Sequence, residues 1–333
     1  MKYRSAYTWG PMTLLAAMLG LGDASANERT TTHCVGRFLI DLPAEAEYIS
    51  GNYEYAFAKV EPQPMERNIF LKEVDDIEAR LRKDVHKSGT SLLLTKVAPS
   101  EDAQIFGYWG NENRSSAVEI SGYRWLHGVR YLVHKRANYD KVERAVSRME
   151  TTISMLQPRD SNSPTTPGFC VGHAIFADEG RTDNESLNIR FRFSKHLDII
   201  IDVATNFNAG DPPESLLSRR PGTFSALGVL GATLGGIRNI RVGDRTISDH
   251  PGQEWLMKAP NEHGQKAHLF SWEAPGLHRD ALHPQIRIDL QSGNFDGGLD
   301  PKPISMTDKQ MLELWDRILN SLRLRPTAAA PSQ

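Results

Sequence analysis

The chain has 333 residues, with 39 lysines and arginines against 41 aspartates and glutamates and a formal net charge of −2. This balance excludes a protein held on nucleic acid or on an anionic membrane surface by its overall charge. The length favours two domains. Two cysteines are too few for a disulfide scaffold, although an oxidising compartment would allow one bond between them.

Residues 1–26 have the order typical of a secretory signal peptide. Lys2 and Arg4 give a positive start, residues 14–21 are apolar, and residues 24–26 (Ala-Ser-Ala) form a small-residue cleavage site. The apolar run is too short to span a bilayer. We therefore expect a mature chain that begins at Asn27, is located in the periplasm and has no integral membrane span.

The first half of the mature chain shows a helical stripe followed by strand-like runs. Apolar residues recur at helical spacing over residues 66–87, namely Phe70, Val74, Ile77, Leu81 and Val85. Strands are predicted after this helix at residues 91–97, 103–109, 116–125 and 129–137.

The second half repeats this order with longer spacers. Strands are predicted at residues 186–193 and 197–205, before a helical region over 213–234. Further strands are predicted at residues 239–248, 253–259, 266–274 and 286–292.

Both halves are predicted to close with an amphipathic helix. Asp140 with Glu143 resembles a capping box for the first helix, and Thr307 with Gln310 starts the second. The two apolar faces lie 169 residues apart and consist of Val142, Val146, Met149 and Ile153 in the first helix and Met311, Trp315, Ile318 and Leu322 in the second.

The tripeptide Cys-Val-Gly occurs twice, at residues 34–36 and 170–172, with a spacing of 136 residues. Together with the closing helices, it favours duplication over coincidence, with about 33 additional residues in the second copy. We therefore predict an α+β protein of two related domains, each a mainly antiparallel sheet packed with helices. Cys34 and Cys170 are candidates for a disulfide, because equivalent positions in related domains can lie close across a pseudo-twofold axis; an inert thiol is the alternative.

The expected domain boundaries follow from composition. Residues 157–168 are rich in Pro, Ser, Asn and Thr and have no apolar period. We expect a signal peptide at 1–26, an N-terminal domain at 27–157, a linker at 158–167, a C-terminal domain at 168–326 and a disordered tail at 327–333.

Motifs for common chemistry are absent from the sequence. It contains no Gly-x-Ser-x-Gly elbow, no phosphate-binding Gly-x-x-x-x-Gly-Lys-Ser/Thr loop and no His-Glu-x-x-His helix. The glycines of residues 228–236 fit neither nucleotide fingerprint. Asp202 and Asp289 lie in alternating strands, where an outward polar face explains them. We predict no catalytic residue and no cofactor.

Two histidine groups contain residue types that zinc sites use. One is Glu262, His263 and His268, and the other is His278, Asp280 and His283. The first group flanks an expected hairpin turn, with one histidine at its tip and the other entering a strand. We interpret these histidines as solvated loop residues and predict no metal site.

Several stretches together resemble a known family: "HCVGRFLIDLPAEAEY", "GFCVGHAIF", "GYRWLHGVRYLV", "GQEWLMK", "HLFSWEAPG" and "LWDRILNSLRLRP". They resemble the two-domain periplasmic immunity proteins that bacteria carry against phospholipase effectors of the type VI secretion system. The resemblance extends from Cys34 to Pro326. It implies a protein that is not an enzyme, whose partner is a cognate lipase effector and which protects the producing cell's membrane. The alternatives are a cell-envelope scaffold or assembly factor, and an exported hydrolase of unknown type.

The resemblance supplies no contact residues, so candidates come from polar loops beside the predicted strands. The additional residues of the second half fall most naturally at 207–236 and 275–284, where helix and strand breakers cluster. We expect the larger share of contacts from the C-terminal domain and a smaller share from the first. The candidates are Asn206, Asn208, Asp211, Glu262, His263, Arg279 and Asp280, with Asn111, Glu112 and Arg114 from the N-terminal domain.

Overall fold

The computed structural model describes most of the chain after residue 28. The described residues are 29–110, 117–178, 184–208, 214–219, 236–260, 265–278, 280–293 and 302–328. The expected signal peptide lies outside this range, as does most of the predicted helical region at 213–234. In the described part of the chain, no helix is long and apolar enough to cross a membrane.

The first half runs from a short hairpin to a closing helix. Its elements are β1 (Thr30–Val35), β2 (Phe38–Pro43), β3 (Ala46–Tyr55), β4 (Ala58–Pro64), α1 (Arg67–Lys83), β5 (Leu93–Ser100), β6 (Ala103–Trp109), β7 (Ala117–Leu126), β8 (Val129–Asn138), a 3₁₀ turn (Tyr139–Lys141) and α2 (Val142–Met155).

Strand β9 (Leu156–Pro158) ends the first half. The described elements of the second half follow a similar order and are β10 (Gly168–Val171), β11 (Ala174–Ala177), β12 (Asn184–Phe193), β13 (His196–Asn208), β14 (Arg238–Asp244), β15 (Gln253–Pro260), β16 (Lys266–Ala274), β17 (Gln285–Gln291), α4 (Asp308–Ser321) and β18 (Arg323–Leu324).

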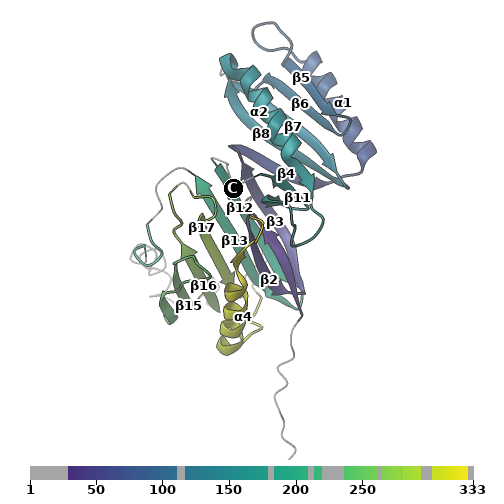
Figure 1. Cartoon of the computed structure of the whole chain (residues 1–333). Helices are drawn as coiled ribbons and strands as arrows, with labels where there is room; N and C mark the ends of the chain where they lie inside the picture. Colours follow the sequence, from purple (N-terminus) through teal and green to yellow (C-terminus); the bar gives the residue numbers. More distant parts are fainter. Residues whose placement is uncertain are drawn as a thin grey trace, which may run out of the picture.

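Twelve of the described strands form one antiparallel sheet, in the order β14-β15-β16-β17-β13-β12-β3-β4-β8-β7-β6-β5. Strands from the two halves do not alternate in this sheet; they meet once, where β3 pairs with β12. Figure 1 shows two lobes, with β5 to β8, α1 and α2 in one and β12 to β17 and α4 in the other. Because β2 and β3 lie with the second lobe, the lobes do not coincide with the two halves of the sequence. The mainly antiparallel sheet with helices agrees with the predicted fold class.

Two smaller sheets are built by exchange between the halves. The hairpin β1-β2 pairs with β18, which follows the last helix, and the hairpin β10-β11 pairs with β9, which follows α2. The backbone N–H of Arg159 donates to His173 O at 3.0 Å, and that of Arg325 donates to Arg37 O at 2.9 Å. Each half thus contributes a strand to the cysteine hairpin of the other.

The cysteine hairpins meet at the centre of the molecule. Cys34 and Cys170 form a disulfide with Cα atoms 6.1 Å apart, and the N–H of Cys170 donates to Gly36 O at 2.9 Å. Gly36 and Gly172 have φ values of 61° and 56°, a conformation that glycine adopts without steric cost. The repeated Cys-Val-Gly therefore supplies a turn residue and a cross-link at equivalent places.

Apolar side chains fill both faces of the first lobe. Helix α2 buries Met149 and Ile153 over β7, where a Cβ on Gly122 would come within 2.9 Å of both side chains. Helix α1 covers the opposite face with Phe70 and Val74. Close approach of α2 to the sheet thus depends on Gly122.

The structure corrects four details of the sequence interpretation. Lys141 is the N-cap of α2 and makes no side-chain cap, so Asp140 with Glu143 is not a capping box; Asp140 lies in the preceding 3₁₀ turn. Helix α1 ends at Lys83 rather than at residue 87. Residues 157 and 158 belong to β9. Ala328 is buried and its carbonyl accepts a 2.6 Å hydrogen bond from Arg37, so it is not part of a tail.

The segment predicted as a linker is also held in place. The guanidinium group of Arg325 donates to Thr166 O at 2.9 Å and also to the carbonyl of Gly168. Thr327 Oγ1 donates to Pro164 O at 3.0 Å. The C-terminal residues therefore fix residues 164–168 against the body of the protein.

Candidate partner-binding surface

Most of the predicted contact residues cannot be placed. The side chain of Asn208 is not among those described. Seven further candidates lie outside the described residues, namely Asn111, Glu112, Arg114, Asp211, Glu262, His263 and Arg279. Asn206 is exposed on β13. Asp280 lies in the loop between β16 and β17, where its carboxylate accepts from Leu282 N at 2.9 Å and contacts His283 Nδ1 at 2.8 Å. Asp280 is therefore engaged within its own loop.

The histidines of the predicted groups differ from one another in the structure. His268 is not a solvated residue: it is fully buried in β16, with Nδ1 2.7 Å from Ser292 Oγ and Nε2 2.8 Å from Asp308 Oδ1. Burial lowers the pKa of His268. Among the described histidines of the two groups, only His278 is exposed, while His283 contacts Asp280 as above.

The strand pairing places Asn206 in a row of residues that leads toward the first lobe. Asn206 lies opposite Gln285 of β17 and opposite Ser186 of β12, and Ser186 lies opposite Glu54 of β3. One row of residues thus leads from the β16–β17 loop to the turn between β3 and β4. Both elements lie at the end of the second lobe's sheet that faces the first lobe (Figure 1).

The turn between β3 and β4 has an unusual backbone. Ala56 and Phe57 have φ values of 51° and 60°, which belong to the left-handed region that residues other than glycine, asparagine and aspartate rarely adopt. Tight hairpins with this geometry favour Asn-Gly. Asn184 holds the turn, since its O accepts from Ala56 N at 2.9 Å and its Oδ1 from Phe57 N at 3.2 Å. The turn presents a Phe57 side chain that is 64% exposed.

A rigid base supports this turn. The Tyr55 hydroxyl donates to Asp178 Oδ2 at 2.5 Å, and its ring stacks on Phe176 with centroids 4.1 Å apart. Arg37 binds the carboxylates of Asp178 and Glu185 in the same buried cluster. Burial raises the pKa of Tyr55, and the neighbouring Asp178 raises it further. Phe57 is therefore displayed on a preorganised element.

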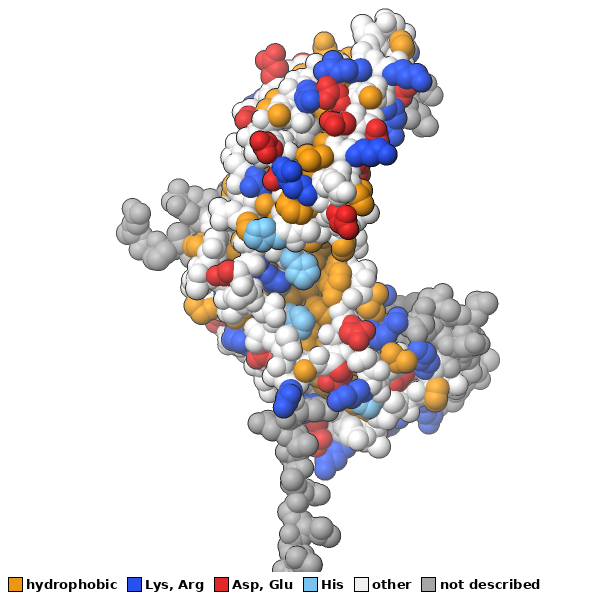
Figure 2. Space-filling view, turned by 90° about the vertical axis from the view of Figure 1, so that its right-hand side faces the viewer, with side chains coloured by type: hydrophobic (Ala, Val, Ile, Leu, Met, Phe, Trp, Pro, Cys, Tyr) orange, Lys and Arg blue, Asp and Glu red, His pale blue; other side chains and the backbone are white. Residues whose placement is uncertain are grey.

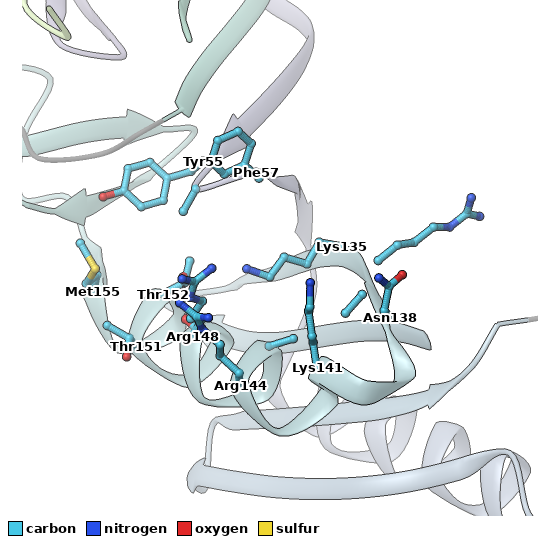
Figure 3. A pocket seen from close by; sticks show the side chains of 14 residues that line it. Tyr55, Phe57, Lys135, Asn138, Lys141, Arg144, Arg148, Thr151, Thr152 and Met155 are labelled. Atoms are coloured by element: carbon cyan, nitrogen blue, oxygen red, sulfur yellow. Dashed lines mark hydrogen bonds between the residues drawn. The ribbon is translucent and has the colours of Figure 1, made fainter. Parts of the chain in front are cut away.

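A groove of about 690 Å³ opens beside the turn. It is lined by the turn itself, by the end of β8 and by the outward side of α2 (Figure 3). Five of its side chains are cationic and no lining residue is acidic; the cations are Lys135, Arg136, Lys141, Arg144 and Arg148. We call this feature the cationic groove.

Four of these cations have no counter-ion within the described part of the chain. Arg136 pairs with Glu119 at 2.6 Å, whereas Lys135, Lys141, Arg144 and Arg148 form no ion pair with a described carboxylate. Burial and the charge of Arg148 lower the pKa of Lys135. Unpaired like charges gathered in a concave surface attract an anionic group from another molecule.

The lining of the cationic groove has the composition of a binding surface. Its rim combines Phe57 with the apolar side chain of Met155. An aromatic anchor beside cations is typical of an interface centre.

A second hollow, lined largely by β15, β16 and β17 of the second lobe, differs from the cationic groove in its charges. It has a volume of about 380 Å³ and is lined in part by Trp255 and Met257. Its ionic residues pair with one another: Arg287 Nε lies 2.6 Å from Asp289 Oδ2, and Arg219 contacts Glu273. This hollow therefore offers less electrostatic attraction than the cationic groove.

The surface is also hollowed on the side seen in Figure 2. Where the lobes meet, hydrophobic and histidine side chains gather in a depression. Strand β3 lies along this side in Figure 1, and its Tyr48 and Ile49 are 51% and 41% exposed. The depression thus adds apolar surface where the lobes meet, whereas Tyr48 and Ile49 lie toward the end of β3 that is farther from the turn at residues 56 and 57.

A two-lobed sheet with preorganised loops and an unpaired cationic groove is typical of a protein that binds another macromolecule. Comparison with known proteins identifies the family to which the chain belongs. The chain belongs to the Tle cognate immunity protein 4 family: residues 31–163 match the family's N-terminal domain and residues 162–327 match its C-terminal domain. The resemblance seen in the sequence is thereby confirmed.

Solved structures agree with this assignment. The chain is similar to the apo structure of immunity protein TplEi of the T6SS from Pseudomonas aeruginosa, with 27% identity and a TM-score of 0.77 over 90% of this chain and 98% of that chain. The same values hold for a chain in the crystal structure of the Tle4-Tli4 complex. TplEi complexed with an "L" peptide matches at 25% identity and a TM-score of 0.72, over 90% and 99% of the two chains. No match was found among curated proteins.

Proposed function

We propose that this protein is the immunity protein of a type VI secretion phospholipase, which it binds and inhibits in the periplasm without catalysing a reaction. Membership of the Tle cognate immunity protein 4 family and similarity to a chain of the Tle4-Tli4 complex support this proposal. The protein then acts by holding the incoming lipase in a form that cannot attack the producing cell's phospholipids.

The cationic groove is the observation that carries the proposal for this chain. Its four cations without described partners favour a complementary anionic surface, and Phe57 supplies an apolar anchor at the rim. A tight inhibitor needs about 800 Å² of contact per partner with a few well-packed anchors. Two lobes that contact one partner can supply that area. We infer that an acidic segment of the lipase occupies the groove, either to plug its active site or to hold its lid closed.

The test is inhibition of the phospholipase encoded beside this gene. The two proteins should co-purify as a complex, and increasing amounts of the immunity protein should abolish phospholipid hydrolysis at a fixed molar ratio. A control with an unrelated phospholipase excludes sequestration of the lipid substrate. Unchanged hydrolysis at saturating immunity protein would refute the proposed function.

Periplasmic location depends on residues 1–26, which lie outside the described structure. We propose that they are a cleaved signal peptide. The protein should be released by osmotic shock, and N-terminal sequencing should begin at Asn27. A chain that retains Met1 in the cytoplasmic fraction would contradict this.

The predicted contact loops remain part of the proposal. Shortening of residues 275–284 and, separately, of residues 110–115 should each weaken inhibition, with circular dichroism to verify folding. Asn206 adjoins the first of these loops through Gln285. If both shortened proteins inhibit as well as the parent, the partner contacts the cationic groove without these loops.

We also propose that the two halves arose by duplication. The cysteine hairpins are equivalent, and each receives the strand that follows the other half's closing helix. The backbone hydrogen bonds of Arg159 and Arg325 take corresponding places in this arrangement, and these two residues are 166 positions apart in the sequence. The apolar faces of the two closing helices indicate a spacing of 169 residues, which is three more. The second half then contains about 30 additional residues rather than 33. Solution mapping of these strand pairings by hydrogen exchange tests the equivalence, since both short sheets should be protected to a similar degree.

A further inference from the structure

Two histidines and an aspartate that do not line the cationic groove converge near the β16–β17 loop. They are Asp249 and His250 in the turn before β15, and His283 in the loop before β17. His250 Nδ1 lies 2.9 Å from Asp249 Oδ1, and His283 Nε2 lies 3.4 Å from Asp249 Oδ2. One ligand atom from each residue falls within 4.8 Å of the other two. Tetrahedral zinc with bonds of about 2.1 Å separates its ligand atoms by about 3.4 Å, so side-chain rotations that bring these atoms up to about 1.4 Å closer together would complete the site.

The remaining nitrogen of each imidazole is already bound by an acceptor. His250 Nε2 lies 3.2 Å from Leu282 O, and His283 Nδ1 lies 2.8 Å from Asp280 Oδ2. A carbonyl and a carboxylate only accept, so these two nitrogens carry protons. The other two nitrogens, His250 Nδ1 and His283 Nε2, face Asp249 and are the ones that a metal ion would take in place of any proton shared with its carboxylate. Histidines that bind metals have this arrangement, with the second nitrogen donating to a carbonyl or carboxylate.

The position of each group is fixed before any ligand arrives. Asp280 Oδ1 accepts from the backbone N–H of Leu282 at 2.9 Å and of His283 at 3.3 Å, which closes the loop on itself. The His250 ring is 3% exposed and packs edge-on against Phe38 with centroids 5.3 Å apart. Asp249, by contrast, is 63% exposed, so an ion can enter from solvent.

The charge of the cluster favours a cation. Asp249 and Asp280 are both carboxylates, and no lysine or arginine among the described residues forms an ion pair with either. Two neutral imidazoles and a carboxylate suit zinc and related divalent transition metals rather than calcium or magnesium, which take oxygen ligands.

We propose that Asp249, His250 and His283 bind one divalent transition-metal ion, with Zn²⁺ as the best match, and that Asp280 positions His283. Three protein ligands leave one tetrahedral position for water. The ion links the β16–β17 loop to the turn before β15. This differs from the sequence interpretation, which placed His283 among solvated loop histidines.

The test uses the mature chain without a histidine tag, stripped with EDTA and titrated with Zn²⁺ by calorimetry. We expect one Zn²⁺ per chain and a higher melting temperature with Zn²⁺ than with EDTA. His283→Gln and Asp249→Asn should each reduce Zn²⁺ affinity at least about 100-fold, and Asp280→Asn about 10- to 100-fold. Co²⁺ should give the strong visible absorption of a tetrahedral site in the parent and lose it in His283→Gln.

The matched control is His278→Gln, the same substitution at an exposed position of the same loop. It should bind Zn²⁺ as the parent does. The proposal is wrong if the parent binds no Zn²⁺, or if His283→Gln binds it as tightly as His278→Gln does. If His283→Gln unfolds, the variant Asp249→Asn tests the proposal instead, because Asp249 is exposed and its substitution should not affect folding. A Zn²⁺ affinity like that of the parent in this variant would overturn the assignment. None of these measurements involves the lipase.

Discussion

Helices α2 and α4 each pack on the sheet of one lobe but are held in different ways. Both close their half of the chain and both bury an apolar face against the sheet. In α2, the fully buried side chains of this face include Met149 and Ile153. In α4, they include Trp315 and Leu319, and ionic contacts are added.

Two ionic clusters tie α4 to the sheet. At its first turn, Asp308 lies 2.7 Å from Lys258 Nζ and 2.8 Å from His268 Nε2 and also contacts Arg238. In its second half, Asp316 pairs with Arg241 and Arg245 at 2.5 and 2.7 Å. The charges of α4 are thus largely satisfied inside the protein.

The outward charges of α2 are not satisfied in this way. Lys141, Arg144 and Arg148 face the cationic groove without a counter-ion among the described carboxylates. The closing helix therefore uses charge for stability in the second lobe and, in our proposal, for recognition in the first. Charges that stabilise a fold pair internally, while charges that recognise a partner remain available.

The largest expected effect comes from breaking the covalent link between the halves. The disulfide joins residues 136 apart in sequence, and closure of so long a loop is worth up to about 5 kcal/mol in the chain-entropy model. Cys34→Ser with Cys170→Ser should lower the free energy of unfolding by several kcal/mol, as measured by urea denaturation. Parent protein reduced with dithiothreitol should show the same decrease in the free energy of unfolding as the double variant. Two free thiols in denatured, non-reduced parent would contradict the bond.

The next largest effect tests the recognition side of the comparison. Arg144→Glu with Arg148→Glu should weaken binding of the lipase at least about 100-fold, which is about 2.8 kcal/mol, because the groove then repels an anionic segment. The melting temperature should change little, since neither side chain forms an ion pair with a described residue. Affinity is measured by calorimetry or biolayer interferometry.

A double charge reversal on α1 is the matched control for the groove. Lys72 and Lys83 are exposed and form no ion pair with a described residue. Lys72→Glu with Lys83→Glu changes net charge equally but leaves the groove intact. Equal loss of affinity in both double variants would mean that the lipase responds to overall charge and not to the cationic groove.

Local patterns in the sequence predicted individual elements well. The alternation over residues 103–109 and 266–274 corresponds to β6 and β16 without a shift. Thr307 and Gln310 form the expected capping box, because both partners lie within one turn and need no tertiary support. The capping box predicted from Asp140 and Glu143 does not form, because contacts with distant residues influence the backbone there. Tyr139 stacks on Trp109 with centroids 4.7 Å apart, and this tertiary contact accompanies a 3₁₀ turn before α2.

Features that depend on distant segments could not be predicted in this way. Residues 156–158 and 323–324 look like helix ends followed by linker or tail, yet each adds a strand to the hairpin of the other half. The strand at 129–137 and the helix after it were predicted, but the cationic groove was not, because no sequence pattern shows which cations lack partners. The convergence of Asp249 and His250 with His283 likewise depends on the fold that places two separate turns side by side.

A smaller effect tests the stability side of the comparison. Asp308→Asn should lower the free energy of unfolding by about 1 to 2 kcal/mol near neutral pH, after allowance for solvent screening of this partly exposed group. Hydrogen bonds from Lys258 and His268 lower the pKa of Asp308 below its ordinary value of 3.8. Its contribution is therefore complete above that value and is lost as the pH falls toward the lowered pKa.

The pH dependence separates Asp308 from the other carboxylates. Urea denaturation of the parent and of Asp308→Asn should differ most at pH 6 to 7 and converge as the pH falls below about 4. Glu313→Gln, an exposed change on the same helix, is the control and should follow the parent at every pH. A difference between parent and Asp308→Asn that stays constant below pH 4 would show that the effect is not ionic.

The smallest expected effect concerns the turn at the rim of the groove. Ala56→Asn with Phe57→Gly introduces the pair that left-handed turns favour and should raise the free energy of unfolding by about 1 kcal/mol. The same change removes the exposed aromatic ring and should weaken lipase binding about 10-fold. Ala56→Asn alone is the control, because it relieves one unfavourable φ while Phe57 remains. Its free energy of unfolding should rise by a few tenths of a kcal/mol, and it should bind the lipase as the parent does. If Ala56→Asn binds as weakly as the double variant, the shape of the turn rather than the Phe57 side chain determines recognition.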